Sequence, residues 1–288
     1  MEAWVLGEAV RGGINMIEII NVSKQFFEGK WWGQKKSIQA LDNISLHIKE
    51  GSCFAIVGES GSGKSTLGKI LIGLEQPDSG EILFNGLNLF SSPKNREHVR
   101  KDMQIVFQDC FSAVNPRMKI KDVIAEPMRV HLRSSSIEIQ EEVKRLLEIV
   151  GLMPDDGEKY SHQFSGGQLQ RITIARAISI KPKVIILDEV INSLDVLVQI
   201  SILKLLKRLQ RERNLTYLFI SHDLHAVKLF ADEVAVLDKG RIVDYAEKVQ
   251  DFDQLTHPAS RRLIEAQLPI KPQQVNEDTL MKTEINVS

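Results

Sequence analysis

Two acidic side chains follow a short apolar run in the stretch KVIILDEVINSLDVLVQ. The run VIIL leads directly into Asp188 and Glu189, and Asp195 comes a few residues later. A buried strand that ends in carboxylates can bind a metal ion or supply a general base, or it can simply meet solvent. These three alternatives make the end of this strand the first candidate site.

A glycine-rich segment earlier in the chain provides a substrate for such carboxylates. GESGSGKS, from Gly58 to Ser65, matches the phosphate-binding pattern G-x-x-x-x-G-K-[ST]. It lies between CFAIV, typical of a buried strand, and LGKILIGLE, which has helical spacing. Backbone N–H groups of such a loop close around phosphates, whereas the alternative is a glycine turn that only caps a helix. The full pattern in this context predicts phosphate contacts from Gly58, Ser60, Gly61, Ser62, Gly63, Lys64, Ser65 and Thr66.

The loop and the carboxylates together predict a site for ATP and Mg²⁺. We expect Lys64 to neutralise the β- and γ-phosphates and Ser65 to ligate Mg²⁺. Asp188 ends an apolar strand that follows a phosphate-binding loop, which is the usual position of a second Mg²⁺ ligand. Glu189, one residue further, can polarise an attacking water.

Composition narrows the class of protein. The chain has 288 residues, 43% hydrophobic and 26% charged, which is ordinary globular composition for one large or two modest domains. A net charge of −1 gives no overall basic field of the kind that marks nucleic-acid binders. No apolar run approaches the roughly 20 residues that span a bilayer, and residues 1–15 lack the apolar core of a signal peptide. Two cysteines, Cys53 and Cys110, are too few for a disulfide framework, so we expect a cytoplasmic protein.

The order of apolar patterns predicts an α/β fold with a parallel sheet. Strand patterns at 184–187 and 216–223 flank a helical pattern at 198–214, which gives the β–α–β rhythm of parallel strands. We expect further strands at 16–26, 40–51, 53–57 and 81–84, a strand pair within 233–246, and helices between about 108 and 181. We expect residues 1–15 to be an N-terminal tail or the result of a start codon assigned too early, and residues 270–288 to be a flexible C-terminal tail.

The most specific phrase is FSGGQLQR, which precedes the second carboxylate strand and resembles the signature of the ATP-binding-cassette (ABC) family. The remaining family motifs follow the expected order. They are an adenine-stacking aromatic at Phe26 in VSKQFF, a glutamine loop at Gln108 in VFQD, a D-loop at Asp195 in NSLD and a switch histidine at His222 in ISHD. The resemblance covers about residues 16–269. It implies a P-loop NTPase (RecA-like) core, an antiparallel β subdomain and an inserted α-helical signature subdomain at about 109–180.

The family resemblance also implies how the motifs cooperate. Two cassettes would dimerise head to tail with two ATP molecules between them, each receiving contacts in trans from Ser165, Gly166, Gly167, Gln168 and Asp195 of the other. His222 would hydrogen-bond the γ-phosphate and position the water beside Glu189, and Gln108 would join the Mg²⁺ ligands and the catalytic residues. Phe26 could instead be a packed aromatic, because Phe27, Trp31 and Trp32 lie close to it.

Two further phrases indicate a branch of the family. The segments 107–128 and 256–269 resemble those of ATPases that drive dipeptide, oligopeptide and nickel importers, and the chain resembles the second of their two ATPase subunits. Where the family usually reads LDEPTSALD, this chain has Val190, Ile191 and Asn192 in place of Pro, Thr and Ser. We expect hydrolysis to survive, because these positions are not those that touch phosphate or metal. The phrase is similar to that of the nickel-import subunit.

The expected protein is a peripheral ATPase on the cytoplasmic face of a bacterial membrane, importing nickel, a metal chelate or peptides. Its partners would be a paralogous ATPase subunit (or a second copy in isolation), two transmembrane permease subunits and, indirectly, an extracytoplasmic binding protein. One alternative is a non-transport cassette of a carbon–phosphorus lyase-type complex. A nucleic-acid cassette is disfavoured by the near-neutral charge and the lack of a coiled-coil insertion.

Overall fold

The computed structural model describes residues 15–28, 36–132, 134–192 and 194–267. The two predicted tails therefore lie outside the described residues, apart from Asn15 at the start of the first strand, and so do Trp31 and Trp32.

A six-stranded sheet forms the centre, in the order β10-β9-β3-β8-β7-β6. Its parallel members are β3 (Cys53–Val57), β6 (Met103–Val106), β7 (Val184–Asp188), β8 (Thr216–Ile220) and β9 (Glu233–Asp238). The edge strand β10 (Arg241–Ala246) pairs antiparallel to β9. Strands β3, β7 and β8 are buried along their whole length, as continuous apolar runs in a parallel sheet should be.

A second, four-stranded antiparallel sheet has the order β2-β1-β4-β5. Its strands are β1 (Asn15–Glu28), β2 (Lys36–Lys49), β4 (Ser79–Phe84) and β5 (Leu87–Asn88). Its apolar side chains and those of α1 (Lys64–Leu71) form one core cluster with the face of β3 that carries Phe54 and Ile56. The other face of β3, with Cys53 and Ala55, packs into a second cluster shared with the helices. Strand β3 leads into the phosphate-binding loop (the P-loop, from Gly58 to Ser65) and thus belongs to both cores.

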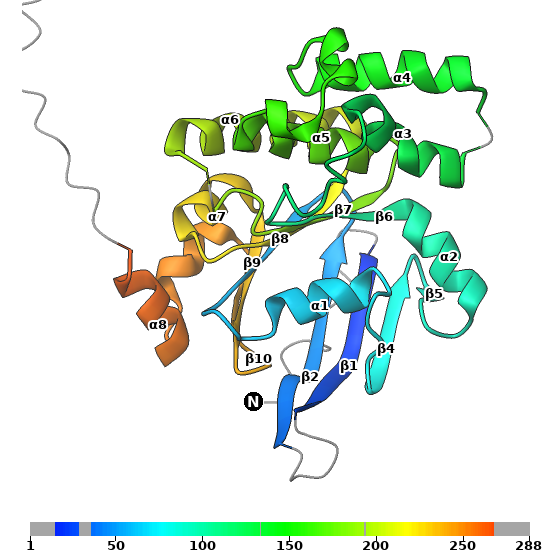
Figure 1. The fold of residues 1–288 in the computed structure, drawn as a ribbon. Coiled ribbons are helices and arrows are strands. Elements are labelled where there is room, and N and C mark those ends of the chain that lie inside the picture. The colour runs from blue at the N-terminus through cyan, green and yellow to red at the C-terminus, as the bar shows by residue number, and fades with distance from the viewer. Residues whose placement is uncertain (1–14, 29–35, 133, 193, 268–288) are drawn as a thin grey trace, which may run out of the picture.

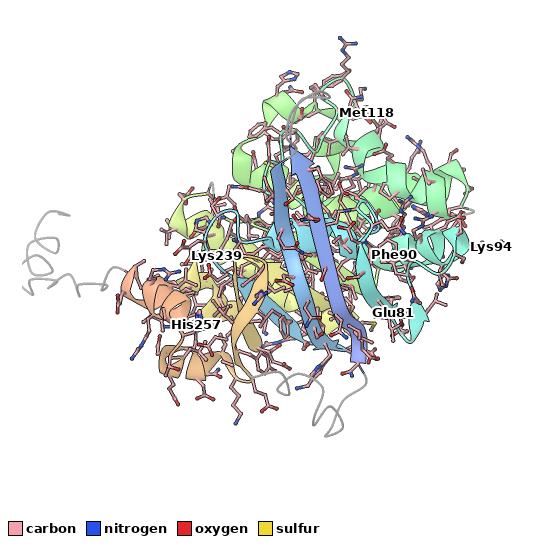
Figure 2. All side chains as sticks on the ribbon, turned by 90° about the horizontal axis from the view of Figure 1, so that it is seen from below. Glu81, Phe90, Lys94, Met118, Lys239 and His257 are labelled. Atoms are coloured by element: carbon pink, nitrogen blue, oxygen red, sulfur yellow. The ribbon has the colours of Figure 1, made fainter. Side chains whose placement is uncertain are left out.

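Helices α3 (Ile120–His131), α4 (Ser136–Ile149) and α5 (Gly166–Ile178) lie together at one end of the molecule, away from the antiparallel sheet (Figure 1). Two 3₁₀ helices, Pro154–Glu158 and Ser161–Gln163, connect α4 to α5. The remaining helices are α2 (Pro93–Asp102), α6 (Val196–Arg213), α7 (Leu224–Phe230), α8 (Pro258–Glu265) and a 3₁₀ helix at Val249–Gln254. Figure 2 shows Met118 at the helical end, Glu81 near the antiparallel sheet and His257 beside α8.

The strands and helices predicted around the candidate site are confirmed, including the hairpin of β9 and β10. The sequence patterns did not indicate strands β5 and β6 or helices α2, α7 and α8, and α2 shows why. Its ten residues are mostly charged, and Val99 is its only buried side chain. It is stabilised instead by Ser92, whose side chain accepts a hydrogen bond from the backbone N of Asn95, and by a proline at the first turn.

Candidate nucleotide-binding site

The phosphate-binding loop runs from the end of β3 to the start of α1 and is held from the side by the β9–β10 hairpin. A Cβ atom on Gly58 would lie 2.1 Å from the carbonyl oxygen of Leu237, so the loop backbone passes directly against β9. The backbone N of Gly240, in the hairpin turn, donates to the carbonyl oxygen of Ser62 at 2.9 Å. The carbonyl of Gly240 in turn accepts from the backbone N of Asp42 in β2 at 2.8 Å. The turn thereby joins the loop to both sheets.

Lys64 carries its positive charge inside this loop. The residue is only 4% exposed, and its Nζ donates to the carbonyl oxygens of Gly58 and Glu59, both at 2.8 Å. Burial lowers the pKa of Lys64, while the nearby carboxylates of Glu189 and Asp188 act in the opposite direction. A cation enclosed by a glycine-rich loop at a helix N-terminus is a binding site for phosphate.

Ser65 and Asp188 meet across the site. The Ser65 Oγ donates to Oδ1 of Asp188 at 3.3 Å, which brings the start of α1 to the end of β7. Burial raises the pKa of Asp188, and the hydrogen bond from Ser65 opposes that shift. A hydroxyl and a buried carboxylate are hard oxygen ligands, so this pair fits Mg²⁺. The third predicted ligand, Gln108, is exposed, and no hydrogen bond joins it to Ser65 or Asp188 in the described part of the chain.

Glu189 and His222 are brought together by the pairing of β7 with β8. These neighbouring parallel strands align Asp188 with Ile220, so the residues that follow them emerge at the same sheet edge. The backbone N of Glu189 donates to the carbonyl of Ile220 at 2.9 Å, and Glu189 itself has a left-handed φ of 52°. Nδ1 of His222 then lies 3.4 Å from Oε1 of Glu189. A carboxylate and an imidazole at this edge can share control of a water molecule.

The segment VIN, residues 190–192, contains two buried side chains and one that faces the site. Val190 and Ile191 are 1% and 0% exposed and belong to the helical core cluster. Asn192 faces the site, with its Nδ2 3.2 Å from Nδ1 of His222. Sequence reasoning missed this contact. The signal available was the position of Asn192 three residues after Glu189, the spacing of a turn that returns the chain toward its start.

The signature residues begin helix α5. Ser165 and Gln168 form a capping box, in which Ser165 Oγ accepts from the backbone N of Gln168 and Gln168 Oε1 accepts from the backbone N of Ser165. Asp195 likewise caps α6 by accepting from the backbone N of Val198 at 3.0 Å. Among the described residues, none of these side chains hydrogen-bonds to Lys64 or to Asp188.

The contacts of Phe26 do not distinguish an adenine-stacking aromatic from one that packs against the protein. Phe26 lies half-buried on β1, and Nζ of Lys24 is 5.4 Å from its ring centroid. Phe27, its neighbour, is 65% exposed. The choice between a stacking and a packing role for Phe26 therefore stays a prediction.

Substituting alanine at the two signature glycines is expected to destabilise the chain at Gly167 but not at Gly166. A Cβ on Gly167 would lie 2.5 Å from Cγ1 of Val198 in α6, whereas a Cβ on Gly166 would make an ordinary 3.7 Å contact with Leu194. Because Val198 is β-branched and stiff, Gly167→Ala should destabilise the chain by about 1–3 kcal/mol.

The matched control, Gly166→Ala, should be neutral or slightly stabilising, because alanine is the better helix former. Thermal unfolding of both nucleotide-free variants tests this. Equal melting temperatures would contradict the close approach of α5 to α6.

Comparison with known proteins decides the family. A family profile described as "ABC transporter" matches residues 41–192. The putative oligopeptide transport ATP-binding protein YkfD of Bacillus subtilis (strain 168) is 40% identical over 275 residues, which cover 94% of this chain and 82% of the relative. The nickel import ATP-binding protein NikE of Brucella suis biovar 1 is 42% identical over 261 residues, covering 90% of this chain and 97% of the relative. The chain belongs to the ABC transporter family.

Solved ABC cassettes share the fold. The post-hydrolysis dimer of the ATP-binding cassette MJ0796, bound to ADP and Pi, aligns with a TM-score of 0.73 at 29% identity, covering 81% of this chain and 99% of that one. CbiO1 from Clostridium perfringens, part of the ABC transporter complex cbiONQ, aligns with a TM-score of 0.72, covering 88% and 96%. The predicted ABC ATPase fold is thus confirmed, and the chain is an ATP-binding, ATP-hydrolysing cassette.

Proposed function

We propose that this cassette drives a membrane importer by hydrolysing ATP at the edge formed by the P-loop, β7 and β8. The proposal rests on one observation, which is that a buried cation and two pairs of side chains lie at the same site. Lys64 lies inside the loop, Ser65 meets Asp188 at 3.3 Å, and Glu189 meets His222 at 3.4 Å. We also retain residues 16–269 as the cassette, with about 109–180 as its inserted helical part.

Each residue has a role in this proposal. Lys64 neutralises charge on the β- and γ-phosphates, with the loop residues Gly58 to Thr66 around them. Ser65 and Asp188, with Gln108, would hold Mg²⁺, which when bound supplies further positive charge against the phosphates. Glu189 accepts a proton from the attacking water, and His222 donates a hydrogen bond to the γ-phosphate.

A second cassette completes the site. Ser165, Gly166, Gly167, Gln168 and Asp195 of that partner would face the nucleotide, and the start of α5 offers a helix N-terminus suited to phosphate. The dimeric state of MJ0796 supports this arrangement. The partner is a paralogous subunit, or a second copy when the chain is alone.

The proposed location is the cytoplasmic face of a bacterial membrane, against two permease subunits. A cavity of about 290 Å³ is lined on one side by β6, Phe107 and Ala113 and on the other by helices α3 and α5, and we propose that a permease helix docks there. Arg176 spans this region, donating to the carbonyl of Ala113 and pairing with Glu126 at 2.7 Å. Among the helices of the described residues, none has the length and apolar character needed to cross a bilayer.

The cargo is proposed from the relatives, which are named for oligopeptide transport and nickel import. The test is deletion of the gene followed by uptake of radiolabelled Ni²⁺, with and without chelator, and of labelled di- and oligopeptides. We expect one of these activities to be lost and to return with the wild-type gene. Affinity purification from membranes should recover two permease subunits and a second cassette. Normal uptake of every cargo, with recovery of soluble phosphonate-metabolism enzymes instead, would replace importer function by the carbon–phosphorus lyase alternative.

A further inference from the structure

The Nδ1 atom of His222 faces two groups that require opposite protonation. The amide Nδ2 of Asn192, a hydrogen-bond donor, is 3.2 Å away, and the carboxylate Oε1 of Glu189, an acceptor, is 3.4 Å away. Nδ1 of a neutral imidazole either accepts or donates a hydrogen bond. Only one of the two contacts can therefore form at a time, and the one that forms selects the tautomer of His222.

Local packing favours the bond from Asn192. If Nδ1 carried the proton, it would donate to Oε1 of Glu189, and the amide N–H of Asn192, 3.2 Å away, would meet a donor in place of an acceptor. Rotating the amide would remove that conflict but would place its NH₂ group where Oδ1 now lies. Oδ1 is buried and has no hydrogen-bond partner among the described residues. Leaving two buried donors unpaired there costs more than leaving one acceptor unpaired. The side chain of Glu189 is 20% exposed, so its carboxylate can be hydrated without His222.

Asn192 is also fixed in place. Its backbone N donates to the carbonyl of Glu189 at 3.3 Å, which closes the turn after β7. The carbonyl of Ile191 accepts from Nε2 of Gln199 in α6 at 3.0 Å, and the side chains of Val190 and Ile191 are buried in the core. The amide is therefore presented to the imidazole by the packed turn that precedes it.

We propose that Asn192 is a positioning residue that holds His222 in the Nε2–H tautomer. Nε2–H is then free to donate to a phosphate oxygen, and both carboxylate oxygens of Glu189 remain free for the attacking water. In the other tautomer, Nε2 would turn a lone pair toward the phosphate and Nδ1–H would occupy Glu189. The inference deepens the proposed function, because it rests on the role of His222 beside the γ-phosphate.

The test is ¹⁵N NMR of histidine-labelled, nucleotide-free protein at about pH 8, where an ordinary imidazole is neutral. Comparison with His222→Gln identifies the His222 signals among the seven histidines. In the wild type we expect Nδ1 to be unprotonated and Nε2 to carry the proton. Asn192→Asp has the same shape but places an acceptor against Nδ1, so it should convert His222 to the Nδ1–H tautomer.

Turnover should follow the tautomer. Asn192→Asp should lower kcat about 100-fold, the lower range for loss of a positioned proton donor, with little change in the KM for ATP. Asn192→Ala removes the amide donor, so Glu189 is the remaining partner of Nδ1 and the Nδ1–H tautomer should again be favoured. Gln140→Glu makes the same amide-to-acid change on an exposed position of α4 and should alter neither spectrum nor turnover.

Two results would overturn the inference: a wild-type His222 protonated at Nδ1, or Asn192→Asp and Asn192→Ala that both keep the Nε2–H tautomer. Failure of the proposed function looks different. In that case His222→Ala would hydrolyse ATP at the wild-type rate, whatever tautomer the NMR spectra show.

Discussion

Replacing Glu189 by glutamine is expected to abolish ATP turnover while leaving ATP binding intact. Glutamine has the same shape, so the turn after β7 and the bond from the Glu189 backbone to Ile220 should persist. The amide cannot accept a proton from the attacking water. A loss of at least about 100-fold in kcat is expected for removal of a general base. Phosphate release and equilibrium binding of a fluorescent ATP analogue, measured on the same preparation, separate the two effects.

The control for this substitution is Glu212→Gln, which makes the same change on an exposed side chain in the last turn of α6. That variant should hydrolyse ATP at the normal rate. An unchanged ATPase rate in Glu189→Gln would remove Glu189 from the role of base. Loss of ATP binding in the same variant would assign it to nucleotide affinity instead.

Replacing Lys64 by alanine is expected to weaken ATP binding by at least about 100-fold, the effect of losing about 2.7 kcal/mol. The ammonium group is buried and bridges two loop carbonyls, so it is the cation that the loop holds in place for the phosphates. Its removal leaves the carbonyl oxygens of Gly58 and Glu59 without their donor, and these oxygens would then face the phosphates without the cation. Titration with ATP by calorimetry measures the loss.

The matched variant is Lys204→Ala, which removes an exposed lysine from α6 and should leave the dissociation constant unchanged. A wild-type affinity in Lys64→Ala would show that the loop does not bind phosphate through this cation. The Lys64 and Glu189 variants together distinguish binding from chemistry, because only Glu189→Gln should retain bound ATP.

The parts of the site that lie within a single motif could be predicted from the sequence. The P-loop, with its buried strand before it and helix after it, follows from glycine spacing and an apolar run, which are local features. The same holds for β7, whose apolar residues end at Asp188. Helix α2 could not be predicted this way, because one buried valine gives no apolar period and its stability comes from the cap at Ser92.

Contacts between motifs required the structure. The approach of Asn192 to His222 depends on the pairing of β7 with β8 and on the left-handed turn at Glu189. From the sequence alone, the replacement of the usual Pro, Thr and Ser by Val190, Ile191 and Asn192 is therefore expected not to affect hydrolysis. The structure shows that Asn192 contacts His222. The sequence analysis also did not predict that Ser165 and Asp195 cap helices α5 and α6, because the family motifs already accounted for the presence of both residues.

The turn at Gly240 has a thermodynamic consequence for each catalytic cycle. It hydrogen-bonds to Ser62 of the P-loop and to Asp42 of the antiparallel sheet, so the loop is ordered by contacts within the chain that do not involve a nucleotide. The conformational entropy of ordering the loop is then lost once, on folding, and not again whenever a nucleotide arrives. Product release likewise leaves behind a loop that keeps its shape. The free energy of ATP binding remains available for bringing two cassettes together.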